Sequence, residues 1–146
     1  MRQPKNEIKN VLCVYAASQT YTSTVFEHLD AFRKYSKSSW SYVDMSLFND
    51  EEVGIDFYDA IVVHYSVRLP FGQMSDTGIR KLYDFRGLRV LFIQDEYDNT
   101  NVVKKIIGAG SFDLVFSVVP DRSMSRIYPS NEFPQTKFVS TLTGYV

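Results

Sequence analysis

Residues 10–16 read Asn-Val-Leu-Cys-Val-Tyr-Ala, and residues 57–65 read Phe-Tyr-Asp-Ala-Ile-Val-Val-His-Tyr. Both are short, nearly continuous apolar runs, as expected of parallel strands that are covered on both faces. Similar runs recur along the chain and alternate with amphipathic segments, which is the pattern of successive βαβ units. The sequence therefore predicts an α/β fold, a three-layer Rossmann-like domain with a mainly parallel sheet of five to six strands.

The other strands and the helices are predicted from the same alternation of short apolar runs and amphipathic segments. Further strands are predicted at residues 40–45, 89–94, 112–119 and 137–142. A helix begins at Thr22 or Ser23, because apolar residues then recur at helical spacing: Val25, Phe26, Leu29 and Phe32. Other helices are predicted from residue 75 or 76 to about 87, from 99 to 107 with Gly108 and Gly110 as the stop signal, and from 121 to 128.

Size, charge and cysteine content limit the classes of protein to which this chain can belong. The 146 residues suffice for one domain and not for two, so residues 1–146 are predicted to form a single Rossmann-like domain. Sixteen Lys and Arg against seventeen Asp and Glu give no basic field, so no nucleic-acid partner is expected. The lone Cys13 excludes an internal disulfide and a zinc site with several thiolates. The longest apolar run near the start, residues 11–17, is far shorter than the ~20 residues of a membrane span, and we expect a cytoplasmic protein with no transmembrane segment.

The expected ligand site lies at the carboxyl edge of the sheet. Six strands are most simply ordered 3-2-1-4-5-6, and ligands bind where such an order reverses. This places the crevice between the loops after the first and fourth strands. The candidate lining residues in these loops are Ser18, Gln19, Thr20, Tyr21, Thr22, Asp95, Glu96, Tyr97 and Asn99. His64, Tyr65 and Arg68 follow the third strand nearby.

The loop after the first strand, residues 16–24, is rich in hydroxyl groups and precedes a helix. Such a loop can hold an anion or a sugar at the helix amino terminus, or its hydroxyls can simply cap the helix. The Gly-x-Gly-x-x-Gly fingerprint and the P-loop are both absent, so the usual modes of dinucleotide and ATP binding are not expected. No cofactor and no metal are predicted.

Two residues are candidates for catalysis, each with a structural alternative. His64 ends a buried strand, where an imidazole can act as general base or can satisfy a neighbouring loop. Asp95 with Glu96 can hold sugar hydroxyls or supply the base, or Asp95 can begin a turn and cap the next helix. Arg68 can neutralise a phosphate or be solvated.

Three other features are read as structural. His28 is expected on the surface of its helix, and Cys13 is expected to be a small core residue. Six acids and no base lie between residues 44 and 59: Asp44, Asp50, Glu51, Glu52, Asp56 and Asp59. Their spacing lacks the order of a calcium loop, so this stretch is interpreted as a solvated acidic loop or a short helix.

Four segments together resemble a known family. They are residues 10–16, residues 58–66 (Tyr-Asp-Ala-Ile-Val-Val-His-Tyr-Ser), residues 90–97 (Val-Leu-Phe-Ile-Gln-Asp-Glu-Tyr) and residues 112–117 (Phe-Asp-Leu-Val-Phe-Ser). This succession resembles the amino-terminal Rossmann-like half of GT-B glycosyltransferases of polysaccharide biosynthesis, over nearly the whole chain.

The resemblance implies a domain that lines the acceptor side of a cleft, while a second Rossmann-like domain binds the nucleotide-sugar donor. By strand position it implies catalytic roles for His64 and Asp95, and contacts to a sugar or glycan acceptor from Ser18, Thr20, Tyr21, Arg68, Glu96 and Tyr97. The family's Glu-x7-Glu donor motif is absent. Because no helix follows the last predicted strand, the chain is expected to be the amino-terminal half of a longer protein.

Two other functions stay open. Residues 18–24 loosely resemble the hydroxyl-rich loop that cradles the phosphate of FMN in flavodoxin-like modules, without the usual glycine before the helix. The domain can also be a non-catalytic interaction module. A phosphorylated receiver is poorly supported, because the required acids and lysine are replaced by Ala16, Ala17, His64 and Pro120.

Overall fold

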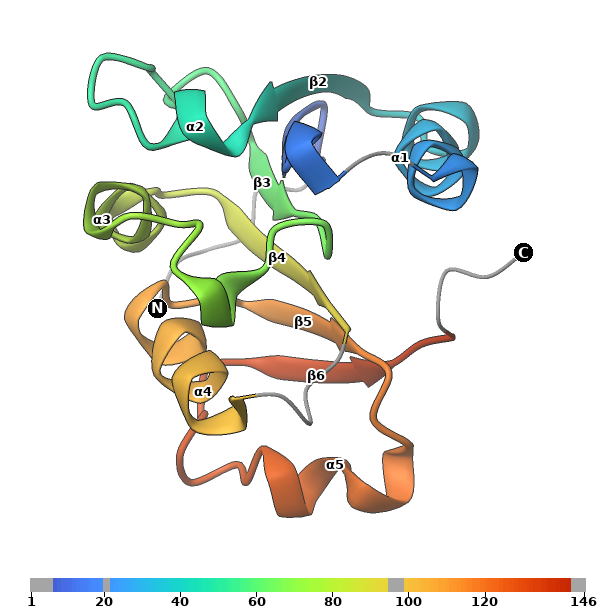
Figure 1. Ribbon diagram of the computed structural model, residues 1–146, viewed down its shortest axis with the longest axis vertical. Helices are drawn as coiled ribbons and strands as arrows, with labels where there is room; N and C mark the ends of the chain where they lie inside the picture. Colours follow the sequence, from blue (N-terminus) through green and yellow to red (C-terminus); the bar gives the residue numbers. More distant parts are fainter. Residues whose placement is uncertain (1–6, 20–21, 95–98, 143–146) are drawn as a thin grey trace.

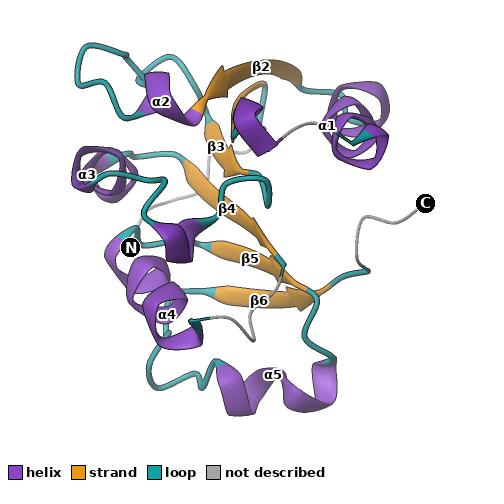
Figure 2. Ribbon diagram, viewed as in Figure 1, coloured by secondary structure: helices purple, strands orange, loops and turns teal. Residues whose placement is uncertain are grey.

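The computed structural model describes residues 7–19, 22–94 and 99–142, and within them six strands form one all-parallel sheet (Figure 1, Figure 2). The strands are β1 (Asn10–Tyr15), β2 (Ser39–Asp44), β3 (Ala60–Val63), β4 (Leu88–Ile93), β5 (Leu114–Ser117) and β6 (Lys137–Ser140). Helical segments connect successive strands, so the predicted three-layer, Rossmann-like α/β fold is confirmed.

The strand order differs from the predicted one. The sheet runs β2-β1-β3-β4-β5-β6, so the order 3-2-1-4-5-6 is wrong. Val11 of β1 pairs with Trp40 of β2 on one side and with Ala60 of β3 on the other. All four residues of β3 are buried, as in an interior strand, whereas Ser39 and Ser41 of the edge strand β2 are exposed. The order therefore reverses between β1 and β3.

The helices divide unequally between the two faces of the sheet. α1 (Ser23–Tyr35) packs through Val25 and Leu29 on the face that carries Cys13. The opposite face is covered by α2 (Met45–Phe48), α3 (Asp76–Asp84), α4 (Thr100–Ala109) and α5 (Asp121–Ile127). In Figure 1, α3 and α4 lie near each other and α1 stands apart from them. Two 3-10 turns, η1 (Ala17–Gln19) and η2 (Leu69–Phe71), follow β1 and β3.

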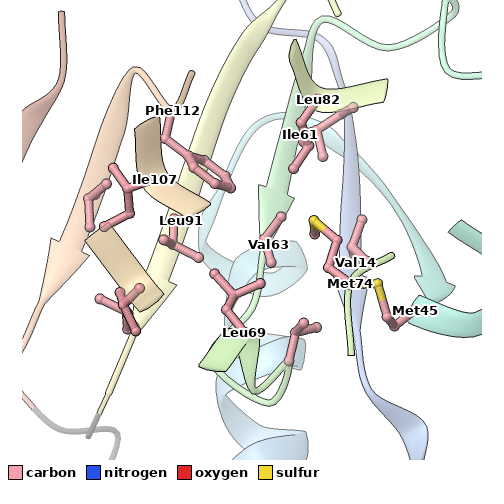
Figure 3. Close-up of a cluster of buried hydrophobic side chains, with 14 of the residues drawn as sticks. Val14, Met45, Ile61, Val63, Leu69, Met74, Leu82, Leu91, Ile107 and Phe112 are labelled. Carbon is pink, nitrogen blue, oxygen red and sulfur yellow. The ribbon is translucent and has the colours of Figure 1, made fainter. Parts of the chain in front are cut away.

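The larger hydrophobic core lies between the sheet and helices α2 to α5. Figure 3 shows strand residues such as Ile61 and Leu91 together with Leu82 of α3 and Ile107 of α4. All four are fully buried, with at most 1% of their surface exposed. Each such side chain stabilises the fold by roughly 1.5–3 kcal/mol through burial, so this core is the main source of stability.

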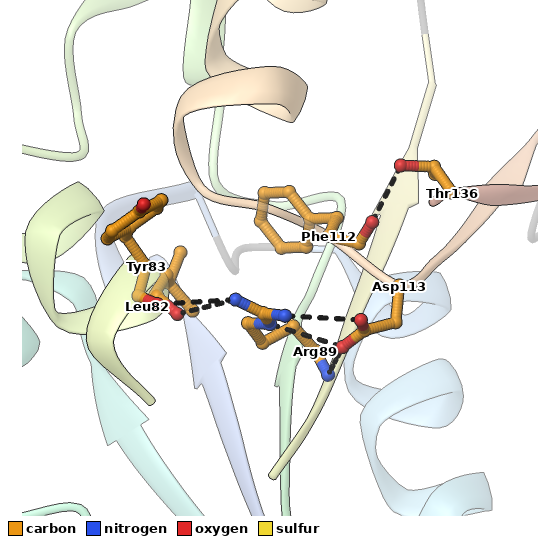
Figure 4. Close-up of polar contacts among 6 residues, drawn as sticks. All are labelled: Leu82, Tyr83, Arg89, Phe112, Asp113 and Thr136. Carbon is orange, nitrogen blue, oxygen red and sulfur yellow. Dashed lines mark hydrogen bonds and ion pairs between the residues drawn. The ribbon is translucent and has the colours of Figure 1, made fainter. Parts of the chain in front are cut away.

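A charged pair joins the amino ends of β4 and β5 (Figure 4). The guanidinium of Arg89 donates to both carboxylate oxygens of Asp113, from Nε at 3.1 Å and from Nη2 at 3.1 Å. Its Nη1 donates to the carbonyl oxygens of Leu82 and Tyr83 at the end of α3, at 3.3 and 3.4 Å. Asp113 also accepts the backbone N–H of Arg89 at 2.9 Å. One buried arginine therefore ties two strands to a helix end.

Two local expectations hold only in part. The acidic stretch contains the short helix α2 and keeps Asp50, Glu51, Glu52 and Asp56 exposed, as expected. Asp59, however, is buried and accepts the backbone N–H groups of Lys9 and Asn10, each at 3.0 Å. These bonds fix the start of β1 beside the start of β3. The helix α4 ends with Gly110 at its C-cap, as expected, but it continues through Gly108 to Ala109, since a glycine inside a helix costs only about 1 kcal/mol relative to alanine.

Gly87→Ala is expected to lower the free energy of unfolding by about 1–3 kcal/mol, the usual cost of forcing extra volume into a packed site. A Cβ at this position would lie 2.3 Å from the carbonyl oxygen of Asp59, a backbone atom that also accepts the N–H of Leu88. Gly108→Ala is the control, because its Cβ meets nothing within 4 Å and should stabilise α4 by about 0.5–1 kcal/mol. Urea unfolding measures both, and equal effects of the two substitutions would contradict the prediction.

Candidate functional site

The observed strand order moves the candidate crevice. In open parallel sheets a ligand lies outside the carboxyl ends of the strands where their order reverses, which here is between β1 and β3. The loop after β1 and the loop after β3 therefore face each other across the site. The loop after β4, which the predicted order placed beside β1, follows the next strand along.

A chain of hydrogen bonds crosses this crevice. The backbone N–H of Ala16, after β1, donates to Oγ of Ser66, after β3, at 3.0 Å. The Oγ of Ser66 lies 2.9 Å from Nδ1 of His64, which also accepts the backbone N–H of Ser66 at 3.0 Å. The other ring nitrogen of His64, Nε2, lies 2.9 Å from Nδ1 of His28 in α1. We call these four residues the histidine chain.

The geometry assigns a proton to each nitrogen of the histidine chain. A backbone N–H can only donate, so Nδ1 of His64 must be an acceptor and the neutral ring carries its proton on Nε2. The Nε2–H of His64 then donates to Nδ1 of His28. The neutral His28 consequently carries its own proton on Nε2. All bonds of the chain run in one direction, which strengthens each of them.

Both imidazoles are held in the neutral form. Burial, together with the nearby charge that His28 can carry, lowers the pKa of His64 to about 3. Burial also lowers the pKa of His28. A protonated His28 would need an acceptor for its Nδ1–H, and the Nε2–H of His64 cannot provide one. At pH 7 the pair is therefore uncharged.

A carboxylate occupies the start of the loop after β1. Oδ1 of Asp44, at the end of β2, accepts the backbone N–H of Ala17 at 2.7 Å. The other oxygen, Oδ2, accepts the backbone N–H of Ser46 at 3.0 Å and also the hydroxyl of Ser46. Burial alone would raise the pKa of Asp44, but the hydrogen bonds from Ser46, Ala17 and Met45 outweigh it and hold the pKa below its usual range. Asp44 is therefore an anion at this edge.

The residues predicted from the sequence are distributed as follows. Ser18 is exposed in η1, and His64 is fully buried within the histidine chain. Arg68 is exposed in the loop after β3, with its guanidinium 4.2 Å from the ring centre of Phe71. Thr22 occupies the N-cap position of α1, and its side chain makes no capping hydrogen bond. Gln19 ends η1, and Asn99 is the N-cap residue of α4 with a left-handed backbone conformation. Five further candidates lie outside the described residues: Thr20, Tyr21, Asp95, Glu96 and Tyr97.

The structure adds three residues to the site. His28, expected on the surface, is only partly exposed and contacts four rings: Phe32, His64, Tyr65 and Phe92, at ring-centre distances of 4.9, 5.0, 5.1 and 5.4 Å. Ser66 and Asp44 complete the polar contacts. A signal for His28 was present, since it lies one residue before the apolar Leu29 and four before Phe32. Its partner His64 could not be inferred from that spacing.

Two depressions lie away from this edge. One, of about 230 Å³, is lined by α3 and the acidic stretch and includes Glu51, Asp56 and Lys81. The other, of about 180 Å³, lies at the amino ends of β4 and β5 beside Arg89 and Asp113. The charged side chains of this second depression are already paired, Arg89 with Asp113 (Figure 4) and Glu132 with Lys104. Neither depression lies where the order of the strands reverses.

Other chemistries find no support in the described residues. No cluster of three or more His, Cys, Asp or Glu there has the arrangement of a metal site. Burial raises the pKa of the Cys13 thiol far above its usual range, so this cysteine is inert. None of the helices in the described ranges has the length and apolar character that a bilayer crossing requires.

Comparisons with known proteins do not place the chain in a family. No protein-family model matches it, and no curated protein and no solved structure matches it significantly.

Proposed function

We propose that this chain is the acceptor-side domain of a glycosyltransferase, which moves a sugar from a nucleotide-sugar donor to a hydroxyl of a glycan or polysaccharide. The acceptor lies at the carboxyl edge between β1 and β3. The donor is bound by a second domain, on the same polypeptide or on a partner. The resemblance of residues 10–16, 58–66, 90–97 and 112–117 to GT-B enzymes supports this proposal.

The observation that carries the proposal is the Asp44 carboxylate on the backbone N–H of Ala17. In phosphate-binding sheets of this class, N–H groups after the first strand hold the anion. Here the N–H of Ala16 is taken by the Ser66 hydroxyl and the N–H of Ala17 by the Asp44 carboxylate, which repels a second anion at close range. Beside it, the exposed hydroxyls of Ser18 and Thr22 can exchange hydrogen bonds with a neutral ligand that carries many hydroxyls. A sugar fits this description better than a phosphate.

The catalytic base is assigned to Asp95 rather than to His64. Both ring nitrogens of His64 are engaged within the histidine chain and the side chain has no exposed surface, so it cannot reach an acceptor hydroxyl. His64 is instead a positioning residue that orients His28. Asp95, which lies outside the described residues, is two positions beyond β4 in the sequence, and its carboxylate is the remaining predicted base.

Binding of neutral oligosaccharides tests the acceptor role. The purified chain is titrated with oligosaccharides from bacterial and plant polysaccharides while backbone amide resonances are followed by NMR. We expect saturable shifts at Ala17, Ser18 and the loop after β3, and we expect Ser18→Ala to weaken them. Ser38→Ala is the matched control, because Ser38 lies on the opposite, amino side of β2. Saturable shifts confined to other parts of the chain would contradict the proposal.

The mass of the native protein tests the need for a donor domain. We expect the mass in the source cell, or the mass of the complex that contains this chain, to be about twice 16.9 kDa or more, since donor-binding Rossmann-like domains are of similar size. A native protein of 16.9 kDa without a partner would leave no place for the donor and would refute the glycosyltransferase proposal.

A second candidate is an FMN-binding module, which two observations favour. The order β2-β1-β3-β4-β5 is that of flavodoxin-like sheets, in which FMN lies at the β1/β3 reversal. The side chain of Thr22 also leaves the first turn of α1 without a capping bond, as a phosphate site requires. Quenching of FMN fluorescence by the purified chain would favour this function, and the Asp44 carboxylate leads us to expect none.

A further inference from the structure

The histidine chain ends in one ring nitrogen, Nε2 of His28, that has no hydrogen-bond partner among the residues that the structure describes. Among the described residues, no buried side-chain nitrogen or oxygen lacks a hydrogen bond. The Nε2 atom of His28 makes no hydrogen bond there, since the single hydrogen bond of this ring is the one that Nδ1 accepts from His64. Nε2 of His28 must therefore reach the molecular surface, where it can meet a ligand.

The direction of the hydrogen bonds in the histidine chain decides whether Nε2 of His28 donates or accepts a hydrogen bond. If Nδ1–H of His28 donated to His64, then Nε2 of His28 would carry a lone pair and could act as a base. That arrangement would put a proton on Nδ1 of His64, directly against the backbone N–H of Ser66 at 3.0 Å. The backbone N–H of Ser66 can only donate, so the hydrogen bonds of the histidine chain are donated in the direction from Ala16 to His28. The Nε2–H of His28 is therefore a donor.

The surroundings of His28 are aromatic. Phe92 and Phe32 meet its ring edge-on, at interplanar angles of 77° and 76°. Tyr65 lies 5.1 Å away at 57°. Tyr65 and Phe92 are both partly exposed. The outward N–H thus lies beside apolar ring surface, as in sites that combine a few oriented polar groups with aromatic walls.

We propose that the Nε2–H of His28 donates a hydrogen bond to a hydroxyl oxygen of one acceptor sugar ring, whose apolar C–H face packs on Tyr65 or Phe92. We call this the His28 subsite. It deepens the proposed function and rests on it for the identity of the ligand. His64 and Ser66 do not touch the sugar; they hold the proton of His28 on its outer nitrogen.

The first experiment reads the proton positions without any ligand. Two-bond proton–nitrogen correlation spectra of the imidazole rings distinguish the two neutral tautomers and the cation. We expect both histidines, the only two in the chain, to carry their proton on Nε2 at pH 7. A His28 with its proton on Nδ1, or a cationic His28, overturns the His28 subsite and leaves the proposed function untouched.

The second experiment tests the ligand with methyl glycosides of glucose, galactose, mannose and N-acetylglucosamine as probes. We expect at least one to shift the Nε2–H resonance of His28 saturably. His28→Leu and His28→Glu should weaken its binding by about tenfold, the usual worth of one hydrogen bond, because neither offers an outward donor. His28→Gln should retain binding within a few-fold, because an amide both accepts from His64 and donates outward.

The outcomes separate the two proposals. Binding that is unchanged in folded His28→Leu overturns the His28 subsite while supporting a sugar site elsewhere at the edge. If binding is lost equally in His28→Leu and His28→Gln, His28 has a packing role, and this result also overturns the His28 subsite. Failure of every glycoside, and of the oligosaccharides used to test the acceptor role, refutes the proposed function and the sugar as ligand together. Circular dichroism confirms that each variant is folded.

Discussion

Replacing Asp113 with Ala is expected to lower the free energy of unfolding by about 3–5 kcal/mol, the usual cost of leaving one member of a buried ion pair alone. The side chain of Arg89 is 6% exposed, and Asp113 is its only carboxylate partner within the described part of the chain. Without that carboxylate the guanidinium keeps only the two long bonds to the carbonyl oxygens of Leu82 and Tyr83. The backbone N–H of Arg89 also loses its acceptor.

Asp30→Ala is the matched control for this experiment. Asp30 forms an ion pair with Arg33 at 2.6 Å, but both side chains are more than half exposed. Exposed pairs of this kind contribute about 0–1 kcal/mol. Urea unfolding at pH 7 compares both variants with the wild-type chain. Losses of similar size in Asp113→Ala and Asp30→Ala would show that burial of Arg89 does not govern the strength of its ion pair.

Lowering the pH from 7 to 5 is expected to cost the wild-type chain about 2 kcal/mol of stability through His64 alone. The pKa of His64 falls from 6.5 in the unfolded chain to about 3 in the folded one. Below pH 6.5 the unfolded chain therefore binds a proton that the folded chain refuses. This contribution to stability is complete above pH 6.5 and is lost progressively as the pH falls toward 3.

His64→Gln isolates this effect, because glutamine does not titrate. The free energy of unfolding is measured at pH 7 and pH 5 for each chain, and only the difference between the two pH values is compared, so any basal destabilisation of the variant cancels. We expect the variant to lose about 2 kcal/mol less than the wild type over this interval. His28 and Asp44, whose pKa values are also lowered, are present in both chains, so their acid sensitivity is not what distinguishes the two chains. An unchanged pH dependence in His64→Gln would rule out a neutral, buried His64.

The sequence predicts the strands well because each is a short apolar run with a clear burial pattern. The composition of each strand also indicates whether that strand lies inside the sheet or at its edge. Ala60–Val63 is uninterrupted and apolar, which indicates an interior strand, while Ser39–Asp44 alternates Ser with aromatic residues, which indicates an edge. The order 3-2-1-4-5-6 would have placed these two strands the other way round.

The site is harder to predict than the strands. His28 and His64 are 36 positions apart, and their contact depends on α1 packing across β1 onto the strand next to it. That geometry exists only when β3 is the neighbour of β1. The contact between Asp44 and Ala17 has the same origin, since it joins the ends of the adjacent strands β1 and β2. Local periodicity carries no information about such neighbours.

The order of the sheet also has a consequence for synthesis. Strand β1 leaves the ribosome first, β2 then pairs on one side of it, and β3 to β6 add in turn on the other side. No strand has to be inserted between two that are already paired, so the sheet can grow while translation continues. At each stage the most recent strand of the β3 side is an open edge, and after β3 this edge is the fully apolar Ala60–Val63. A pause in translation at that stage leaves the nascent chain at its greatest risk of aggregation until Leu88–Ile93 arrives to cover it.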